Sequence, residues 1–465
     1  MQRLNKIIAW IGLTALALPA MAQEKYAFSI QQALDYAKKN NVQVKNALLG
    51  IQLQQQQNRE ITAAAYPQIS GSIGATYNPY VATQVLPNFI SPSVYQVLKD
   101  QGVKDGNGNP IVMPSDFGNI AAQFGTKFNA SAGVDLNQLL FDGQVFIGLK
   151  ARSTSIEWQT KLAEVTDETI RANIYKIYYQ LLVGKTQIEL LDANITRIEK
   201  LSHDTKELYK NGFAEQLDVN KVDVQTANLN TEKLKALNTI SNGYLGLKFL
   251  MGMPIKDSLI LTDSLNEEEI KQGVLPLADY SYKDRKDYQY AELGKKLNEF
   301  NVKRYQLSQI PTFSLSGNYS KSAQRNNFDF FGKGDWYNVS AISLRISVPI
   351  FKGFATKARI GQARIQLQQT QNQIASLQIQ IDQEVETAKA NFTTAVTTLD
   401  YQKKNMALAE TVYEQTKKKY EVGTGSNTEI TAAETDLKQA QTNYISAVYD
   451  AIIAKIDYIK ATGKL

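Results

Sequence analysis

A stretch of 61 residues between Gly361 and Gly423 contains neither glycine nor proline, and it limits the fold more than any other feature of this sequence. Apolar side chains recur along it at every third or fourth position, as on one face of an α-helix. A helix from Gly353 to Glu421 would extend for roughly 100 Å at ~1.5 Å per residue. Because no globular domain buries a rod of that length, the pattern predicts long helices packed as coiled coils. The apolar positions are Ile360, Ala363, Leu367, Ile374, Leu377, Ile381, Val385, Ala388, Phe392, Val396 and Leu399.

The chain is also internally duplicated. Residues 140–143 (Leu-Phe-Asp-Gly) return at 350–353 as Ile-Phe-Lys-Gly, and residues 209–212 (Tyr-Lys-Asn-Gly) return at 420–423 as Tyr-Glu-Val-Gly. Each half reads as a helix, a proline, two alternating stretches, a Phe-x-Gly, a very long helix, a Tyr-x-x-Gly and a second helix. The first half carries 34 additional residues, which fall within 79–126 and are expected to form an extracellular loop.

After each proline the apolar period changes from 3.6 to 2. The preceding helices are expected at 29–65, with Ser29 as the N-cap, and at about 284–308. Pro67 and Pro311 end them because proline has no amide hydrogen to donate. The stretches that follow predict four strands per chain, each with one apolar and one polar face and close to the ~10 residues that a tilted membrane strand requires. Aromatic residues flank both predicted hairpins, as they do at membrane interfaces. They are Tyr77, Tyr80, Phe124, Phe128, Phe328, Phe330, Phe331, Trp336 and Tyr337.

The N-terminus has the pattern of a secretory signal peptide. Arg3 and Lys6 precede a short apolar run, and small residues at Ala20 and Ala22 suit cleavage before Gln23. No later segment has the ~18 uninterrupted apolar residues of a membrane helix, so any membrane crossing is expected to use strands. The chain has no cysteine, which excludes a disulfide framework. Its net charge of +6 comes from Lys and Arg interspersed with Asp and Glu, and this pattern excludes a nucleic-acid-binding surface.

These observations predict the domain organisation. The linker is expected to include a short strand through Leu259, Ile260 and Leu261. The predicted segments are a signal peptide at 1–22, a first structural repeat at 23–253 with its β-hairpin at 67–140, a linker or equatorial segment at 254–280, and a second repeat at 281–465 with its β-hairpin at 311–350.

Four strands are too few to close a membrane barrel, because the smallest have about eight, and an open sheet edge in lipid leaves backbone groups without partners. Association is therefore required, and three copies would supply twelve strands. The predicted fold is mainly α with a membrane β part. Long coiled-coil hairpins and four strands per chain trimerise into a 12-stranded β-barrel and an α-helical barrel.

The ordered landmarks resemble the TolC-like outer membrane efflux protein family. The resemblance rests on residues 29–34 (Ser-Ile-Gln-Gln-Ala-Leu), Tyr66-Pro67, residues 140–143 and the duplicated Tyr-x-x-Gly, and it covers essentially the whole mature chain. It implies a homotrimeric channel in the outer membrane of a Gram-negative bacterium, extending into the periplasm and exporting small molecules or polypeptides. The implied partners are outer-membrane lipid, a periplasmic adaptor (membrane fusion) protein, and an inner-membrane efflux pump or ABC transporter, as in type I secretion.

The resemblance also implies a periplasmic gate where the helical hairpins turn. Gly212 and Gly423 end the long helices, and turn geometry alone accounts for them. Tyr420 matches a family tyrosine three residues before the second glycine, and Asp218 matches the aspartate that this tyrosine contacts. Glu429 matches an acidic pore-lining residue, whose threefold copies would attract cations.

Two other family positions are not matched. Gly425 stands where the family has an arginine, and Ala432 stands where it has a second acid, so the closing network is thinner here. A competing interpretation treats Asp218 and Glu429 as ordinary acids at helix N-termini, favoured by the helix dipole. Tyr420 could equally be a packing residue.

Nothing in the sequence predicts an enzyme, a cofactor or a metal site. His203 is the only histidine, it lies in a charged helical stretch, and no cysteine is available to complete a metal cluster. No nucleophile, phosphate-binding or dinucleotide-binding motif is present. The alternative to a channel is an exported coiled-coil scaffold or adhesin without a pore, whose strands would pack against each other in water.

Overall fold

The computed structural model describes residues 25–266, 268, 280–332 and 334–465. The predicted signal peptide and residues 269–279 of the predicted linker lie outside these ranges. The chain divides into two compact units. The described residues of the helical unit fall within 25–57, Ala151–Phe300 and Gln362–Leu465, and those of the sheet unit fall within Asn58–Lys150 and Asn301–Gly361. The boundaries of the two sequence repeats stay a prediction.

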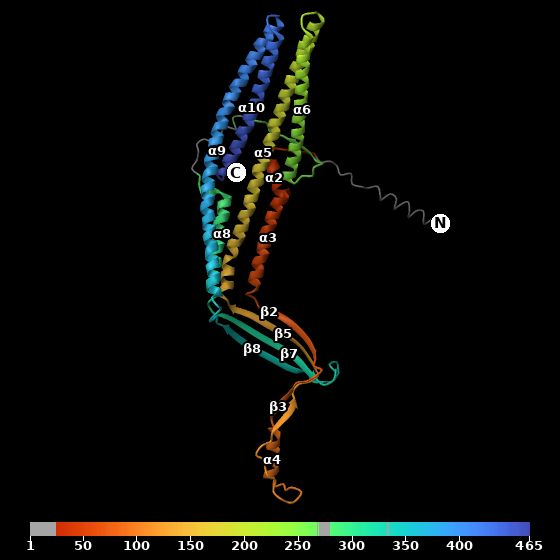
Figure 1. Cartoon of the computed structure of the whole chain (residues 1–465), viewed down its shortest axis with the longest axis vertical. Helices are drawn as coiled ribbons and strands as arrows, with labels where there is room; N and C mark the ends of the chain where they lie inside the picture. Colours follow the sequence, from red (N-terminus) through yellow and green to blue (C-terminus); the bar gives the residue numbers. More distant parts are fainter. Residues whose placement is uncertain (1–24, 267, 269–279, 333) are drawn as a thin grey trace, which may run out of the picture. The chain divides into compact units, whose positions relative to one another are not determined.

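Two long helical hairpins confirm the predicted rods (Figure 1). In the first, α5 (Gly143–Lys210, 68 residues) is followed by α6 (Gln216–Met251). In the second, α9 (Ala355–Glu421, 67 residues) is followed by α10 (Asn427–Ala461). No helix among the described residues is both long and apolar enough to cross a membrane.

The turns of the two hairpins have the same geometry. Gly212 and Gly423 have φ values of 79° and 78°, in the left-handed region that glycine adopts without steric cost. The amides of the next residues, Phe213 and Thr424, donate to carbonyls five residues earlier at 2.8 and 2.9 Å. Such bonds define the Schellman motif, which satisfies the last carbonyls of a helix. Both glycines therefore lie in turns that end the long helices.

The helix predicted at 29–65 is in fact two helices, α2 (Ile30–Asn40) and α3 (Val42–Ala63), so the prediction of a single helix is wrong at Asn41. The Asn41 side-chain oxygen accepts hydrogen bonds from the first amides of α3 at 2.7 and 3.1 Å. Its side-chain nitrogen donates to the carbonyl of Leu250 in α6 at 2.6 Å. Asn41 leaves the helical conformation because these bonds replace the helical ones.

Shorter elements complete the helical unit. Strands β1 (Lys25–Phe28) and β6 (Ser258–Leu261) pair in parallel, and β6 confirms the short strand predicted in the linker. Ser29 caps α2 as predicted, by accepting a hydrogen bond from the Gln32 amide. In the order of elements along the second half, α8 (Lys286–Leu307) occupies the place that α3 has in the first.

All four predicted strands lie in one antiparallel sheet, in the order β2-β5-β7-β8. They are β2 (Gln68–Tyr77), β5 (Phe128–Phe141), β7 (Thr312–Arg325) and β8 (Tyr337–Ser347). Because β2 and β5 come from the first half and β7 and β8 from the second, the β5–β7 pair joins the two halves of the chain.

The inserted segment of the first hairpin contains structure that the sequence analysis did not predict. Strands β3 (Thr83–Pro87) and β4 (Asn119–Gln123) form an antiparallel ribbon, and α4 (Ile90–Asp100) lies beyond them (Figure 1). The two strands have five residues each, too few for a clear alternation, and the whole insertion was expected to be a loop.

Helix α5 contributes to hydrophobic cores with helices of both halves. Its Tyr178, which is fully buried, shares one cluster with Met251 of α6 and with residues of α2. Further along α5, Val183 shares a second cluster with Val448 and Ile452 of α10. The hairpins of the two repeats are therefore packed together through one shared helix.

Candidate functional site

The sheet has one apolar and one polar face. Rows of directly opposed residues cross all four strands; one such row is Ile69, Leu136, Gly317 and Ile342. Opposed residues in an antiparallel sheet share a face, so the apolar residues of all four strands lie together. The apolar residues and glycines of this face are Ile69, Gly71, Ile73, Ala75, Tyr77, Phe128, Ala130, Ala132, Val134, Leu136, Phe313, Leu315, Gly317, Tyr319, Ala323, Ile342, Leu344 and Ile346. The face also carries the polar Gln138, Asn338 and Ser340, and it turns charged at Lys321 and Arg325.

This apolar face is largely uncovered by the described part of the chain. Ile73 in β2 is 91% exposed and Ile342 in β8 is 85% exposed. The opposite face carries serine, threonine and asparagine side chains together with the charged Asp135 and Arg345. A single chain in water would therefore expose a large apolar surface, which marks a site that contacts lipid or protein.

The outer edges of the sheet are unpaired. Strands β2 and β8 each have one strand neighbour, and within the described residues neither pairs on its other side. Their free N–H and C=O groups can bond to water or to another strand, but not to lipid.

Aromatic rings gather at both ends of the sheet. At one end Tyr77 stacks on Phe128 with ring centroids 4.7 Å apart, and Phe128 meets Phe328 edge-on at 5.8 Å. At the other end Phe141 contacts Phe313 at 6.0 Å and Phe146 at 5.4 Å. Two aromatic belts that flank an apolar band are typical of strands in a bilayer.

At the hairpin tips, the residues predicted to form a gate lie in different local environments. The Tyr420 hydroxyl is 3.5 Å from the Thr205 hydroxyl of α5, and its ring packs against the cluster formed by Tyr413, Ile430 and Leu437. Throughout the described part of the chain no hydrogen bond joins Tyr420 to Asp218, so the predicted link between them stays a prediction.

Asp218 belongs to the start of α6. Its carboxylate accepts from the Glu215 amide at 3.4 Å and lies 3.7 Å from the Lys221 ammonium. The nearby Asn427 side chain of α10, the Glu215 amide and Lys221 together hold the pKa of Asp218 below its usual value. The carboxylate is therefore charged at neutral pH and lies next to the second hairpin.

Glu429 has a corresponding place at the start of α10. It forms a capping box with Ser426, in which each side chain accepts from the other residue's amide, at 3.2 and 3.4 Å. The carboxylate is exposed. Helix capping therefore accounts for its backbone contacts, and its outer oxygens remain accessible to ions.

Gly425, which stands where the family has an arginine, lies in a tight part of this turn. Its amide donates to the Lys419 carbonyl at 3.0 Å, and a β-carbon at this position would lie 3.0 Å from the Tyr420 backbone nitrogen. A longer residue would require this turn to shift.

Sequence analysis missed a buried polar network that joins the two hairpins. Glu434 of α10 is only 3% exposed, and Arg197 of α5 approaches its carboxylate at 3.4 Å. The guanidinium also donates to Asn194 and lies over the Tyr413 ring, 5.7 Å from its centroid. Asn194 in turn donates to Gln441 of α10 at 2.9 Å. We call these five residues the buried network.

Burial dominates the electrostatics of the buried network. Burial raises the pKa of Glu434, and the positive charge of Arg197 opposes that shift. Burial and the Glu434 carboxylate also raise the pKa of Tyr413. The sequence does contain a signal, because Glu434 interrupts the apolar stripe of Ile430, Ala433 and Leu437. Its partner, 237 positions away, could not be identified from the pattern.

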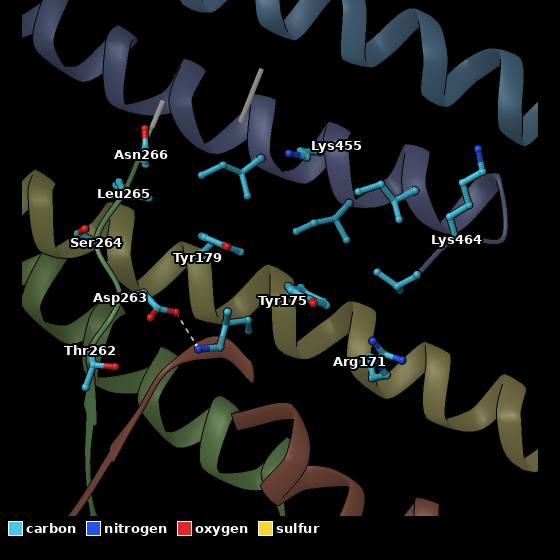
Figure 2. Close-up of a pocket in the computed structure, with 15 residues that line it drawn as sticks. Arg171, Tyr175, Tyr179, Thr262, Asp263, Ser264, Leu265, Asn266, Lys455 and Lys464 are labelled. Carbon is cyan, nitrogen blue, oxygen red and sulfur yellow. Dashed lines mark hydrogen bonds between the residues drawn. The ribbon is translucent and has the colours of Figure 1, made fainter. Parts of the chain in front are cut away.

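A cleft of about 750 Å³ lies between α5 and α10, beside the segment that follows β6 (Figure 2). Tyr175 and Tyr179 of α5 and Lys455 of α10 line it. Asp263 anchors the segment after β6 by accepting from the Ile30 amide at 2.8 Å. The cleft therefore lies beside residues 262–266, in the described part of the linker.

His203 is exposed on α5, and among the residues described no group of three or more His, Asp or Glu side chains could hold a metal ion.

Comparisons with known proteins agree with this architecture. Residues 283–464 match the family model described as outer membrane efflux protein. The outer membrane protein TolC of Vibrio cholerae is 19% identical over 336 residues, covering 72% of this chain and 77% of that protein. The outer membrane channel CmeC of Campylobacter jejuni is similar in structure, with a TM-score of 0.74 at 16% identity over 96% of this chain and 90% of that one. CusC gives a TM-score of 0.75 at 15% identity over 93% and 92% of the two chains.

Replacing Arg197 tests the buried network. Arg197→Leu should destabilise the protein by about 3 kcal/mol, because it leaves the Glu434 carboxylate buried without its cation. The matched control is Lys206→Met, which cuts the half-exposed Lys206–Asp223 pair and should cost less than about 1 kcal/mol. Thermal unfolding in detergent measures both. Adding Glu434→Leu to Arg197→Leu should restore most of the lost stability. If Arg197→Leu costs as little as the control Lys206→Met, the Arg197–Glu434 pair is not a buried pair that stabilises the fold.

Proposed function

Since this chain belongs to the TolC-like family of outer membrane efflux proteins, we propose that three copies of it close one pore in the outer membrane and continue that pore as a helical tunnel into the periplasm. Channels of this family are not enzymes; they are trimeric and work within efflux or secretion systems. The protein is an outer-membrane efflux channel that extends into the periplasm.

The observation that supports trimeric closure is the two-faced sheet with unpaired edges. The apolar face, with Ile73 and Ile342 almost fully exposed, suits contact with lipid, whereas the face with Asp135 and Arg345 suits a water-filled lumen. Pairing β8 of one copy with β2 of the next would satisfy both edges. Three copies of four strands then make the twelve strands of the barrel.

The hairpin tips are proposed as the gate. Tyr420, Asp218 and Glu429 lie at or beside the turns that Gly212 and Gly423 create. The closing link from Tyr420 to Asp218 remains part of this proposal, and in one chain the Tyr420 hydroxyl bonds to Thr205 instead. The buried network supplies a fixed connection between the hairpins, since Arg197 lies on α5 and Glu434 on α10.

The proposed partners are a periplasmic adaptor protein and an inner-membrane pump or ABC transporter. A groove of about 570 Å³ between α6 and α10 supports adaptor docking near the tip. Leu217 and Val224 line it and are more than half exposed, while the side-chain oxygens of Gln225 and Thr431 are buried without hydrogen-bond partners. The exposed apolar side chains of this groove suit a protein partner.

A pair of neighbouring substitutions tests the membrane sheet. Ile73→Arg should cost roughly 2–4 kcal/mol per chain, because it places a charge on the lipid face near the middle of a strand. Ser72→Arg should be tolerated, because Ser72 faces the other way and its hydroxyl lies 3.5 Å from the Asp135 carboxylate. The measurement is the amount of heat-sensitive trimer in outer-membrane fractions. Equal trimer levels for both variants, or a wild-type protein that stays monomeric, would show that the proposal is wrong.

Glu429 tests the gate. Glu429→Gln should reduce the cation preference of the open pore, because it removes three carboxylates per trimer while glutamine still completes the capping box. Reversal potentials in a KCl gradient across planar bilayers measure this. Glu215→Gln is the control, because it removes a carboxylate from the turn of the other hairpin. An unchanged reversal potential in the Glu429 variant excludes Glu429 as a pore-lining charge.

Docking is tested in the groove between α6 and α10. Leu217→Arg should make cells several-fold more sensitive to exported compounds, because a buried charge opposes the apolar contact with a partner. Asn230→Arg is the control, because it adds the same charge to an exposed position of α6 that does not line the groove. Both variants should keep the heat-sensitive trimer. Equal sensitivity of the two strains would argue against docking at this groove.

A further inference from the structure

The insertion of the first hairpin is an ordered module with a bare apolar surface. Asn88 holds the helix α4 on the β3–β4 ribbon. Its backbone N–H donates to the Gly118 carbonyl at 3.0 Å, and its side-chain oxygen accepts from the Ser91 backbone N–H at 3.0 Å. The rings of Tyr95 and Phe117 meet edge-on at 5.4 Å. At its other end the helix closes with Gly102, at φ 64°.

Only half of the apolar side of α4 is used within the module. Tyr95 and Leu98 are partly buried, whereas Ile90, Val94 and Val97 are 49%, 50% and 59% exposed. Spacings of four and three residues place these three side chains in one row along the helix. Among the described residues of α4 none is buried, so this row has no cover in a single chain.

The composition of the module argues against membrane-surface binding by α4. Five of the residues in 79–126 are charged, namely Lys99, Asp100, Lys104, Asp105 and Asp116, which gives a net charge of −1. Helices that lie on anionic membranes carry several basic residues on their polar side. The polar side of α4 has Ser93, Gln96, Lys99 and Asp100. Low charge instead allows copies of the helix to approach each other without repulsion.

The location of the module favours another copy as the occupant. The insertion begins directly after β2, and the Asn78 amide donates to the Lys127 carbonyl at 2.7 Å, which joins its two ends. In the proposed trimer β2 is the strand that pairs with the neighbouring chain, so each module begins at the boundary between two copies. Tethered so close together, the helices have a high effective concentration, and weak apolar contacts are enough for association.

We propose that the α4 helices of three chains pack together through Ile90, Val94 and Val97 and form a helical crown over the outer mouth of the pore. The inference rests on the proposed trimer and goes beyond it, because a barrel of twelve strands would close equally well without α4. The crown would limit the width of the exit for exported material.

Cysteine cross-linking tests the crown, because the natural chain has no cysteine. Val94→Cys should form disulfides between copies when outer membranes are oxidised. Each trimer then has three cysteines and can form one disulfide, so at most two chains of every three should appear as covalent dimers after heating without reductant. Gln96→Cys is the matched control on the opposite side of α4, and it should cross-link at least several-fold less. Trimer content is read from unheated samples of the same membranes.

Three outcomes would overturn the crown. If the Val94→Cys and Gln96→Cys variants cross-link equally little and react equally fast with a membrane-impermeant maleimide in an intact trimer, the apolar row is bare. If the Val94→Cys variant neither cross-links nor reacts, lipid or another protein covers the row. If the wild-type chain forms no trimer, the proposed function fails together with the crown, and the unheated samples distinguish that case from the other two.

Discussion

The free edges of β2 and β8 are the constraint on which the rest of this structure depends. Each edge presents backbone groups that must find hydrogen-bond partners, and the apolar face beside them makes lipid the natural surroundings. Lipid cannot supply those partners, so another copy must. The long helices then follow as the continuation of the strands, because each strand pair leads through a Phe-x-Gly into a helix of nearly seventy residues.

Duplication alone would give two independent hairpins, and the structure shows how they are joined. In the sheet unit β5 of the first half pairs with β7 of the second over most of their length. In the helical unit α5 packs against α10, and Arg197 reaches Glu434 between them. A buried ion pair adds little net stability compared with an apolar pair, but removing one partner leaves the other charge buried and unpaired. The buried network therefore connects the two hairpins through groups that depend on each other.

Sequence periodicity predicted the features that depend on repetition along the chain. A local pattern accounts for each of them: the rods, the four strands, Ser29 as a cap, and the turn glycines at 212 and 423. The break at Asn41 was missed. Its side chain caps α3 locally, but its other bond goes to Leu250, more than two hundred residues away, and sequence patterns do not reveal such a partner. The partner of Glu434 was missed for the same reason. Patterns identify which face of an element is buried, and they do not identify the residue that meets it.

The inserted module adds an asymmetry that the duplicated architecture lacks. It interrupts only the first hairpin, so a trimer carries three copies of α4 and not six. One bare apolar row per chain suits a ring of three, in which each helix meets its two neighbours and no surface remains for further copies. If both hairpins carried such a helix, six rows would have to be satisfied around one mouth. Placing the module at β2 alone keeps the association closed and limited to the copies already held by the barrel.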